Sequence, residues 1–267
     1  MREQRYTHGH QDSVLRSHRW RTAGNSAAHL LAELAPGQAL LDVGCGPGTL
    51  TADLAELVAP GRVVGLDASA EVIAEARRTL DERGLTEVET VVGDVYALDE
   101  PDGAFDVVHA HQVLQHLGDP VAALREMRRV CRAGGVVAVR DADYEAMTWW
   151  PGSPELDRWL EVYRSTARSN GAEPDAGRRL VAWAREAGFD EVSSSASVWC
   201  FASPEDRAWW GSLWADRSTG SGFAEQARDH GLTDAIEQGR MAVAWHDWAG
   251  ADDGWFVVVH GELLARP

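Results

Sequence analysis

The sequence predicts an α/β fold in which a mostly parallel sheet of seven strands is covered by helices on both faces. Between Gln38 and Asp143, five short apolar runs alternate with longer segments that carry apolar residues at helical spacing. Strands that are apolar throughout and alternate with helices are typical of parallel sheets with both faces buried. Two further strand-like runs, at 191–202 and 254–265, complete the seven. We expect the last run to be an antiparallel edge strand that closes the sheet.

Helix signals lie between and after the apolar runs. The clearest helix is expected at 119–135, where Asp119 is placed as an N-cap, Pro120 takes the first helical position and Gly134 ends the pattern. The segments 13–20 and 26–35 predict a helical N-terminal part ahead of the first strand. Further helices are expected at 49–59, 69–84, 154–169, 176–189 and 204–217.

Composition and charge exclude several classes of function. The formal charge of −17 argues against binding to a nucleic-acid backbone. All 25 basic residues are Arg, so a lysine Schiff base and a phosphate-loop lysine are excluded. No apolar run approaches the length of a membrane span, and the polar N-terminus does not resemble a signal peptide. Three separated cysteines (Cys45, Cys131 and Cys200) suit a reduced, cytoplasmic protein without a cysteine metal site.

Residues 1–267 are expected to form one domain, because no linker-like segment divides the chain. Within it we distinguish an N-terminal helical cap (1–37), a core of alternating strands and helices (38–143) and a C-terminal part (144–267) with insertions and the last two strands. Eleven of the twelve Trp residues lie in this last part. They either fill a helical core or form an aromatic lid over a substrate.

A glycine-rich turn follows the first strand in "LLDVGCGPGTL" (Leu40 to Leu50). Glycines at a strand-to-helix turn let the backbone approach a ligand closely. The spacing of Gly44, Gly46 and Gly48 is G-x-G-x-G, whereas the dinucleotide fingerprint is G-x-G-x-x-G. This difference disfavours a nicotinamide-dependent oxidoreductase. The carboxylate of Asp42 would also repel a diphosphate, but it could attract an ammonium group.

Three acids are expected at the ends of the first three strands: Asp42, Asp67 and Asp94. The carboxyl ends of parallel strands meet at one edge of a sheet, where ligands bind. An Asp after a strand is often only a helix cap, but three acids together with the glycine turn indicate a ligand site. A ligand with an ammonium group, a ribose diol and an adenine amine would match all three.

The motifs "LLDVGCGPGTL", "VVGLDAS", "VVGDVYAL", "FDVVHAHQVLQHL" and "ALREMRRVCRAGGVVAVRD" resemble those of class I S-adenosylmethionine-dependent methyltransferases. The ubiquinone/menaquinone-biosynthesis-like small-molecule branch is the most similar, over about Leu40 to Asp141. The resemblance implies a Rossmann-like fold and S-adenosyl-L-methionine as cofactor. It also implies methyl transfer to a small-molecule acceptor. From the expected lid over the site we predict that this acceptor is apolar or aromatic, and we expect a monomer or homodimer. A member of the fold that binds the cofactor without methylating remains the alternative.

The resemblance also implies which residues bind the cofactor. Around the methionine portion it places Asp42, Gly44, Cys45, Gly46 and Gly48. Asp67 and Ala68 would take the ribose, and Gly93, Asp94 and Val95 the adenine. Ala110 and His111 would flank the sulfonium. The chain departs from the family at Gln115-His116, where two adjacent His are frequent, and at Arg132–Gly135, where Lys-Pro-Gly-Gly is frequent.

His116 is the first candidate for a catalytic base, with Asp141 as its orienting partner and His111 as the fallback. We expect Asp141 to end the fifth strand and both groups to face the methyl side of the pocket. An imidazole with a pKa near 6.5 would suit proton removal at neutral pH. The histidines can equally have packing roles, and no metal site is expected. The segments around Tyr6 to Trp20 and after Tyr144 are expected to close over the site.

Overall fold

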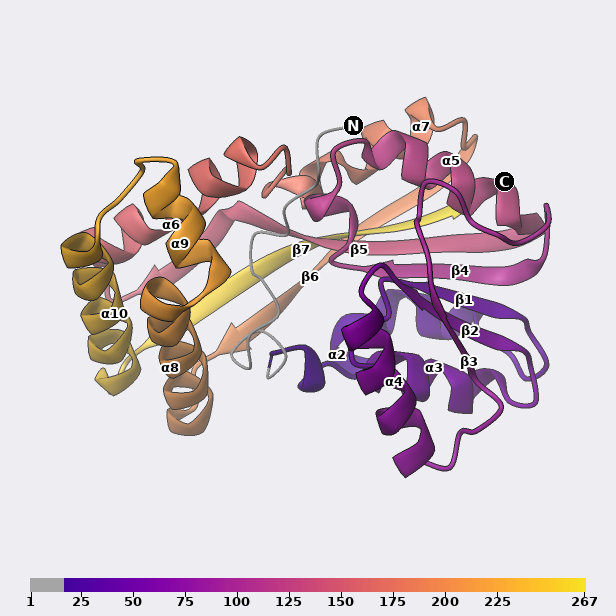
Figure 1. Ribbon diagram of the computed structural model, residues 1–267, viewed down its shortest axis with the longest axis horizontal. Helices are drawn as coiled ribbons and strands as arrows, with labels where there is room; N and C mark the ends of the chain where they lie inside the picture. Colours follow the sequence, from indigo (N-terminus) through magenta and orange to yellow (C-terminus); the bar gives the residue numbers. More distant parts are fainter. Residues whose placement is uncertain (1–16) are drawn as a thin grey trace.

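The computed structural model describes residues 17–267 and contains one seven-stranded sheet in the order β3-β2-β1-β4-β5-β7-β6 (Figure 1). Strands β1 to β5 are parallel, and β7 is antiparallel to both of its neighbours. The mostly parallel sheet and its antiparallel last strand confirm the predicted fold class. The strands are β1 (Leu40–Val43), β2 (Val63–Asp67), β3 (Glu89–Val92), β4 (Phe105–His111), β5 (Cys131–Trp150), β6 (Glu191–Phe201) and β7 (Trp255–Arg266).

Helices cover both faces of the sheet (Figure 1). On one face, α2, α3 and α4 pack over β1 and its neighbours, and α5 and α7 cover the other face. Asp119 caps α5, and Pro120 begins it, as the sequence predicts. The helices of this part are α2 (Ala23–Ser26), the 3₁₀ helix η1 (Ala28–Glu33), α3 (Thr49–Val58), α4 (Ala70–Glu82), η2 (Leu114–His116), α5 (Pro120–Val130), η3 (Ala176–Arg179) and α7 (Leu180–Glu186).

The predicted edge position of the last strand is wrong, since β7 lies between β5 and β6. Most residues of β7 are buried, whereas most residues of β6 are exposed or half-buried. A strand with neighbours on both sides needs apolar side chains along its length, and "WFVVVHGELLAR" supplies them. The serine-rich β6 forms the edge instead.

Strand β5 is longer than predicted. It begins at Cys131, directly after α5, and continues beyond Asp141 to Trp150. Strand β7 pairs with it on both sides of an irregularity between Asp143 and Thr148. These backbone hydrogen bonds carry the strand past the point where its continuous apolar run stops.

A helical unit rich in tryptophan packs where β5 and β6 end and β7 begins, at the left of Figure 1. Trp159, Trp214 and Trp245 are fully buried there, with the Trp159 ring centroid 4.6 Å from Trp214 and 4.8 Å from Trp245. Most of this cluster is therefore core, as one of the two interpretations expected. The unit consists of α6 (Pro154–Ser169), α8 (Pro204–Gly220), α9 (Gly222–Asp229) and α10 (Ala235–Gly250), of which the last two were not predicted.

Among residues 17–37 the N-terminal part is helical in short pieces, at 17–19, in α2 and in η1, and the helix capped by Thr22 ends after four residues. The first part of the predicted cap, before Ser17, lies outside the described residues. No helix within 17–267 has the length and apolar character that a membrane crossing requires.

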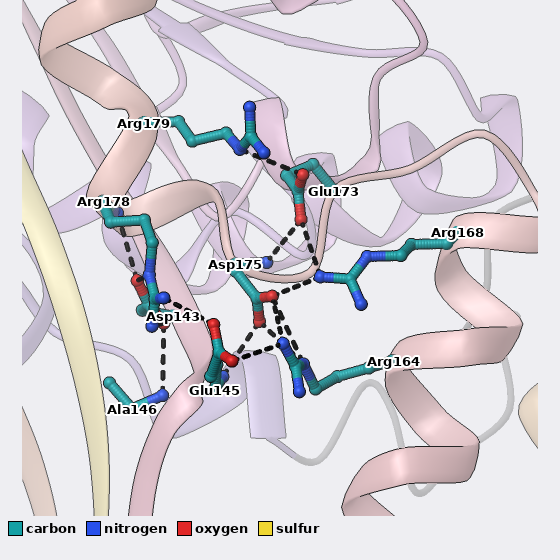
Figure 2. Close-up of polar contacts among 9 residues, drawn as sticks. All are labelled: Asp143, Glu145, Ala146, Arg164, Arg168, Glu173, Asp175, Arg178 and Arg179. Carbon is teal, nitrogen blue, oxygen red and sulfur yellow. Dashed lines mark hydrogen bonds and ion pairs between the residues drawn. The ribbon is translucent and has the colours of Figure 1, made fainter.

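An ionic cluster fastens the Trp-rich unit to the rest of the sheet (Figure 2). Asp175 lies at its centre, is almost fully buried, and accepts hydrogen bonds from Arg164 and Arg168 of α6. The segment that carries Asp175 also contacts η2, because the N–H of Glu173 donates to the carbonyl of Gln115 at 3.0 Å. The charged members are Asp143, Glu145, Arg164, Arg168, Glu173, Asp175, Arg178 and Arg179.

Asp175→Asn should lower the free energy of unfolding by about 2 kcal/mol at pH 7, because two arginines lose a buried anionic partner. Burial alone would raise the pKa of Asp175, but hydrogen bonds from Arg164 and the Glu145 amide, with the charge of Arg168, hold it below the usual value. The stabilisation is therefore complete above the unfolded pKa of about 3.9 and is lost as the pH falls through the lower folded pKa.

Urea unfolding of both proteins at pH 7 and at lower pH measures this difference. Glu161→Gln serves as the control, because its pair with Arg158 is exposed and should contribute less than about 0.5 kcal/mol. An Asp175→Asn effect no larger than that of the control would contradict the role of the cluster.

Candidate active site

The glycine loop connects β1 to α3. Gly44, Gly46 and Gly48 all have positive φ, at 68°, 56° and 82°. A Cβ at Gly44 would lie 2.4 Å from a methyl group of Val113, and one at Gly48 would lie 3.0 Å from the Cα of Ala76. Close packing against the segment after β4 and against α4 therefore demands glycine, in addition to any ligand.

Asp42 lies beneath this loop, in the middle of the sheet, and its residue is only 2% exposed. One carboxylate oxygen accepts a hydrogen bond from the Thr51 hydroxyl of α3 at 2.6 Å. The other lies 2.8 Å from Nδ1 of His109, its partner in the β1–β4 register. With both contacts the carboxylate is fixed in orientation, and it still lines the cavity above it.

Asp67 ends β2 and supports the same loop. Its carboxylate accepts hydrogen bonds from the amides of Gly46 at 3.2 Å and Ser69 at 3.0 Å. Ala68, next to it, is exposed. Asp67 is half-buried and therefore presents part of its surface at the carboxyl end of the sheet.

Asp94 follows β3 at the same end. It is exposed, and its carboxylate accepts the amide of Tyr96 at 2.9 Å. Gly93 is required by close packing, since a Cβ there would lie 2.8 Å from a methyl group of Leu66. Val95 is buried in the core, which leaves its backbone as the part that could contact a ligand.

The strand order brings these residues together. Because β3, β2, β1 and β4 are adjacent and parallel, the loop and the acids lie along one edge of the sheet. A cavity with about 270 Å³ of empty space lies there. Its lining includes His18, Arg21, Asp42, Gly44, Cys45, Gly46 and His111. We call it the loop cavity.

The two predicted residues at the end of β4 face opposite sides of the sheet. Ala110 is packed in the core beneath α5, whereas His111 lines the loop cavity. Neither ring nitrogen of His111 has a hydrogen-bond partner among residues 17–267, although the residue is only 4% exposed. Burial, followed by the positive charges of Arg21 and Arg140, holds the pKa of His111 well below its usual value. The imidazole is thus uncharged, and its free nitrogens suit a polar ligand in the cavity.

The thiol of Cys45 is not reactive in this setting. Burial, followed by the charges of Asp42 and Asp67, raises the pKa of Cys45 well above its usual value. The amides of Gly44 and Cys45 both donate to the carbonyl of Leu66. The loop is thereby tied to β2.

A second cavity adjoins the first, with about 430 Å³ of empty space and with His18 and Arg21 common to both linings. We call it the aromatic cavity. It lies against the Trp-rich unit and is lined by Ser17, His18, Arg21, Gln112, His116, Ala142, Tyr144, Met147, Trp199, Trp210, Trp214, Arg217 and Val258. The sequence did not single out Arg21, Gln112 or Arg217. Gln112 is distinguished by its backbone φ of 54°, which is unusual for a residue other than glycine. This feature is seen in the structure and not in the sequence.

His116 lines the aromatic cavity, but Asp141 lines neither cavity. Side chains alternate along β5, so Asp141 lies on the face opposite Ala142. Its carboxylate accepts the amide of Gln115 at 3.1 Å, and the side-chain amide of Gln115 contacts Nε2 of His116 at 3.0 Å. Gln115 therefore stands between the two predicted partners. The expectation that Asp141 ends its strand and faces the methyl side is wrong.

The protonation states also differ from the expectation. Burial, together with the charge of Arg21, lowers the pKa of His116 to about 3 rather than leaving it near 6.5. Burial raises the pKa of Asp141 to about 7, against the hydrogen bonds from the amides of Gln115 and Leu114. His116 is consequently neutral at pH 7 and a weak base. Among residues 17–267, no three His, Cys, Asp or Glu side chains are grouped so that they could hold a metal.

Comparison with known proteins identifies the family. Residues 34–188 match the model of a methyltransferase domain. An uncharacterized methyltransferase of Schizosaccharomyces pombe is 36% identical over 98% of this chain and 96% of its own length.

Two solved structures are similar in fold. The [4+2]-cyclase SpnF is 26% identical, with a TM-score of 0.53 over 90% of this chain and 80% of its own. A Haemonchus contortus phosphoethanolamine N-methyltransferase in complex with S-adenosyl-L-methionine is 17% identical, with a TM-score of 0.56 over 90% of this chain and 52% of its own. These likenesses concern the fold. The family model and the full-length relative show that the chain belongs to the methyltransferase-domain family and is an S-adenosylmethionine-dependent methyltransferase.

Proposed function

We propose that the enzyme transfers the methyl group of S-adenosyl-L-methionine to a small, apolar or aromatic metabolite by in-line displacement. The adjoining cavities carry this proposal: the loop cavity has the polar groups that suit the cofactor, and the aromatic cavity begins where the loop cavity ends. The cofactor's sulfonium makes its methyl group electrophilic. The protein's contribution is then to align donor and acceptor and to exclude water.

Each part of the cofactor has a proposed partner. Asp42, fixed by Thr51 and His109, would accept hydrogen bonds from the ammonium group, and His111 lies close enough to the loop cavity to contact the same end. Asp67 would take the ribose hydroxyls. The proposed cofactor-binding residues are Asp42, Gly44, Cys45, Gly46, Gly48, Asp67, Ala68, Gly93, Asp94, Val95, Ala110 and His111.

The acceptor side belongs to the later part of the chain in this proposal. Residues 38–143 would hold the cofactor, and elements after Tyr144 would surround the acceptor together with the N-terminal segment of residues 1–37. Trp199, Trp210 and Trp214 line the aromatic cavity from β6 and α8, which supports this division. Aromatic walls suit a flat, apolar acceptor and also attract a sulfonium.

We propose an orienting role for His116 rather than that of a strong base. The amide oxygen of Gln115 accepts the N–H of Ala142, so its NH₂ group faces His116 and donates to Nε2. The proton of the neutral ring then resides on Nδ1, and the ring lines the aromatic cavity from η2. Asp141 would act through Gln115 by fixing η2, and His111 would orient the cofactor.

Turnover separates this proposal from the alternative of a protein that binds the cofactor without methylating; one solved structure of similar fold is that of a [4+2]-cyclase. Incubation with S-adenosyl-L-methionine and a library of aromatic metabolites should yield S-adenosylhomocysteine and a product heavier by one methyl group. EDTA should leave the rate unchanged. Tight cofactor binding with no transfer to any library member would favour the alternative.

Asp67→Asn should weaken binding of S-adenosylhomocysteine by about 1.5–3 kcal/mol, because hydrogen bonds to a charged group contribute about that much. The amides of Gly46 and Ser69 donate to different oxygens of Asp67, and asparagine keeps one of these two acceptors, so thermal melting must first show that the variant is folded. Isothermal titration calorimetry measures the change, with Asp81→Asn, an exposed position on α4, as the matched control. Unchanged affinity in a folded Asp67→Asn protein would refute the ribose role.

His116→Ala should lower kcat about tenfold while leaving the affinity for S-adenosylhomocysteine unchanged, because His116 lines only the aromatic cavity. With a pKa of about 3, His116 is protonated and charged only in strongly acidic solution, and it is neutral above about pH 4. The wild-type rate should therefore show no step from this residue between pH 5 and 8. A step near pH 6.5 that disappears in His116→Ala would show that His116 is an ordinary base.

A further inference from the structure

Two side chains line both cavities, and their position bears on where the methyl group is transferred. Within residues 17–267, His18 and Arg21 are the residues common to the two linings. If the donor occupies the loop cavity and the acceptor the aromatic cavity, the methyl group must cross where the two cavities meet. His18 and Arg21 therefore border the point of transfer.

The chemistry of these two side chains differs. A guanidinium keeps its protons in proteins, so Arg21 can donate hydrogen bonds but cannot take up a proton, whereas the imidazole of His18 can. The other two histidines of the cavities are poor bases, because burial holds the pKa of His111 well below its usual value and lowers that of His116 to about 3. His18 is only half-buried, so that a proton can pass from its ring to water.

His18 is held against the glycine loop. Its carbonyl accepts a hydrogen bond from the hydroxyl of Thr49, the first residue of α3, at 3.2 Å. Its ring lies over the loop, because a Cβ at Gly46 would lie 3.7 Å from Nδ1 of His18. The ring is thus placed beside the backbone that the proposed cofactor would contact.

The residues before and after His18 are fixed to different parts of the molecule. The hydroxyl of Ser17 accepts a hydrogen bond from Arg217 of α8 at 2.7 Å, on the acceptor side. The guanidinium of Arg19 donates to the carboxylate of Glu75 of α4 at 2.9 and 2.6 Å, on the side of the glycine loop. The backbone at 17–19 therefore spans the boundary between the cavities, and the ring of His18 needs little reordering when ligands bind.

We propose that His18 is the catalytic base of the methyl transfer. A lone pair of the acceptor's oxygen or nitrogen would form the bond to the methyl carbon, while the bond of that carbon to sulfur breaks and its electron pair stays on sulfur. The proton of the acceptor's O–H or N–H group would pass to the ring of His18, and the imidazolium would release it to water. The proposal adds a residue to the proposed methyl transfer and rests on that function.

Two probes with the same aromatic frame separate a base from a structural residue. 2-Naphthol keeps its proton at pH 8, whereas 2-naphthalenethiol is ionised there and needs no base. With saturating S-adenosyl-L-methionine, His18→Gln should lower kcat for 2-naphthol about 100-fold, as the loss of a positioned base does, and kcat for the thiol less than about threefold. Mass spectrometry of the methylated products measures both rates.

His246→Gln is the matched control, because His246 is exposed on α10 and lines neither cavity. It should leave both rates unchanged. Nuclear magnetic resonance of the histidine rings gives a readout that does not depend on turnover. Addition of S-adenosylhomocysteine should shift the ring resonances of His18 and leave those of His246 in place. Thermal melting verifies that His18→Gln is folded, and His18→Asn replaces it if it is not.

Equal losses of kcat with the two probes, or His18 resonances that S-adenosylhomocysteine leaves in place, would overturn the role of His18 alone. A wild-type protein that methylates neither probe would contradict the proposed transfer to aromatic acceptors, and the role of His18 with it. The two failures are distinguishable, because the first leaves wild-type turnover intact.

Discussion

A carboxylate buried in the centre of the sheet is the constraint on which this structure depends. Asp42 lies on the middle strand of the parallel part, where its charge is separated from water. Such a charge is tolerated only when hydrogen bonds replace its hydration. Thr51 must therefore approach from α3 and His109 must stand beside it on β4, which fixes how α3 packs and how the glycine loop turns.

The same face of the sheet stays polar far beyond Asp42. Arg140 of β5 and Glu262 of β7 are register partners, and Nε of Arg140 lies 3.3 Å from the Glu262 carboxylate. The serine hydroxyls of β6 continue the row, since those of Ser195 and Ser197 donate to Glu262. Burial lowers the pKa of Arg140 to about 10 despite this partner. The row links the cofactor side of the sheet to Trp199, which lies 5.0 Å from the Arg140 guanidinium carbon and also lines the aromatic cavity.

The parts of the fold that depend on local signals were predictable. Apolar runs located β1 to β5, and the Asp119-Pro120 pair located the start of α5, because these features act within a few residues. The insertion of β7 between β5 and β6 was missed, since strand order depends on contacts far apart in the chain. The continuation of β5 was missed because mixed polar and aromatic residues beyond Asp141 carry no strand pattern.

The candidate site likewise has a part that could be predicted from the sequence and a part that could not. Acids that follow strands could be located from sequence, since the ends of parallel strands share one edge. The contacts of Asp42 with His109 and Thr51 could not, because they depend on the β1–β4 register and on the rotation of α3. Nor could the sequence show that burial removes the basicity of His116, or that one-residue alternation turns Asp141 away from the cavity.

The irregularity in β5 determines which side chains of its outer part face each side of the sheet. From Asp143 to Thr148 the strand advances five positions, while β7 advances only two, from Val259 to Val257. Because register partners face the same side of the sheet, Asp143 and Thr148 share a face although they are five residues apart, so the irregularity reverses the alternation of faces within β5. A deletion or insertion of one residue that shifts the outer part of β5 would exchange the faces of Trp149 and Trp150 and leave the pairing of Arg140 with Glu262 untouched. The outer part of β5, which supports the Trp-rich unit, can therefore change its facing without altering the register on the side of the glycine loop.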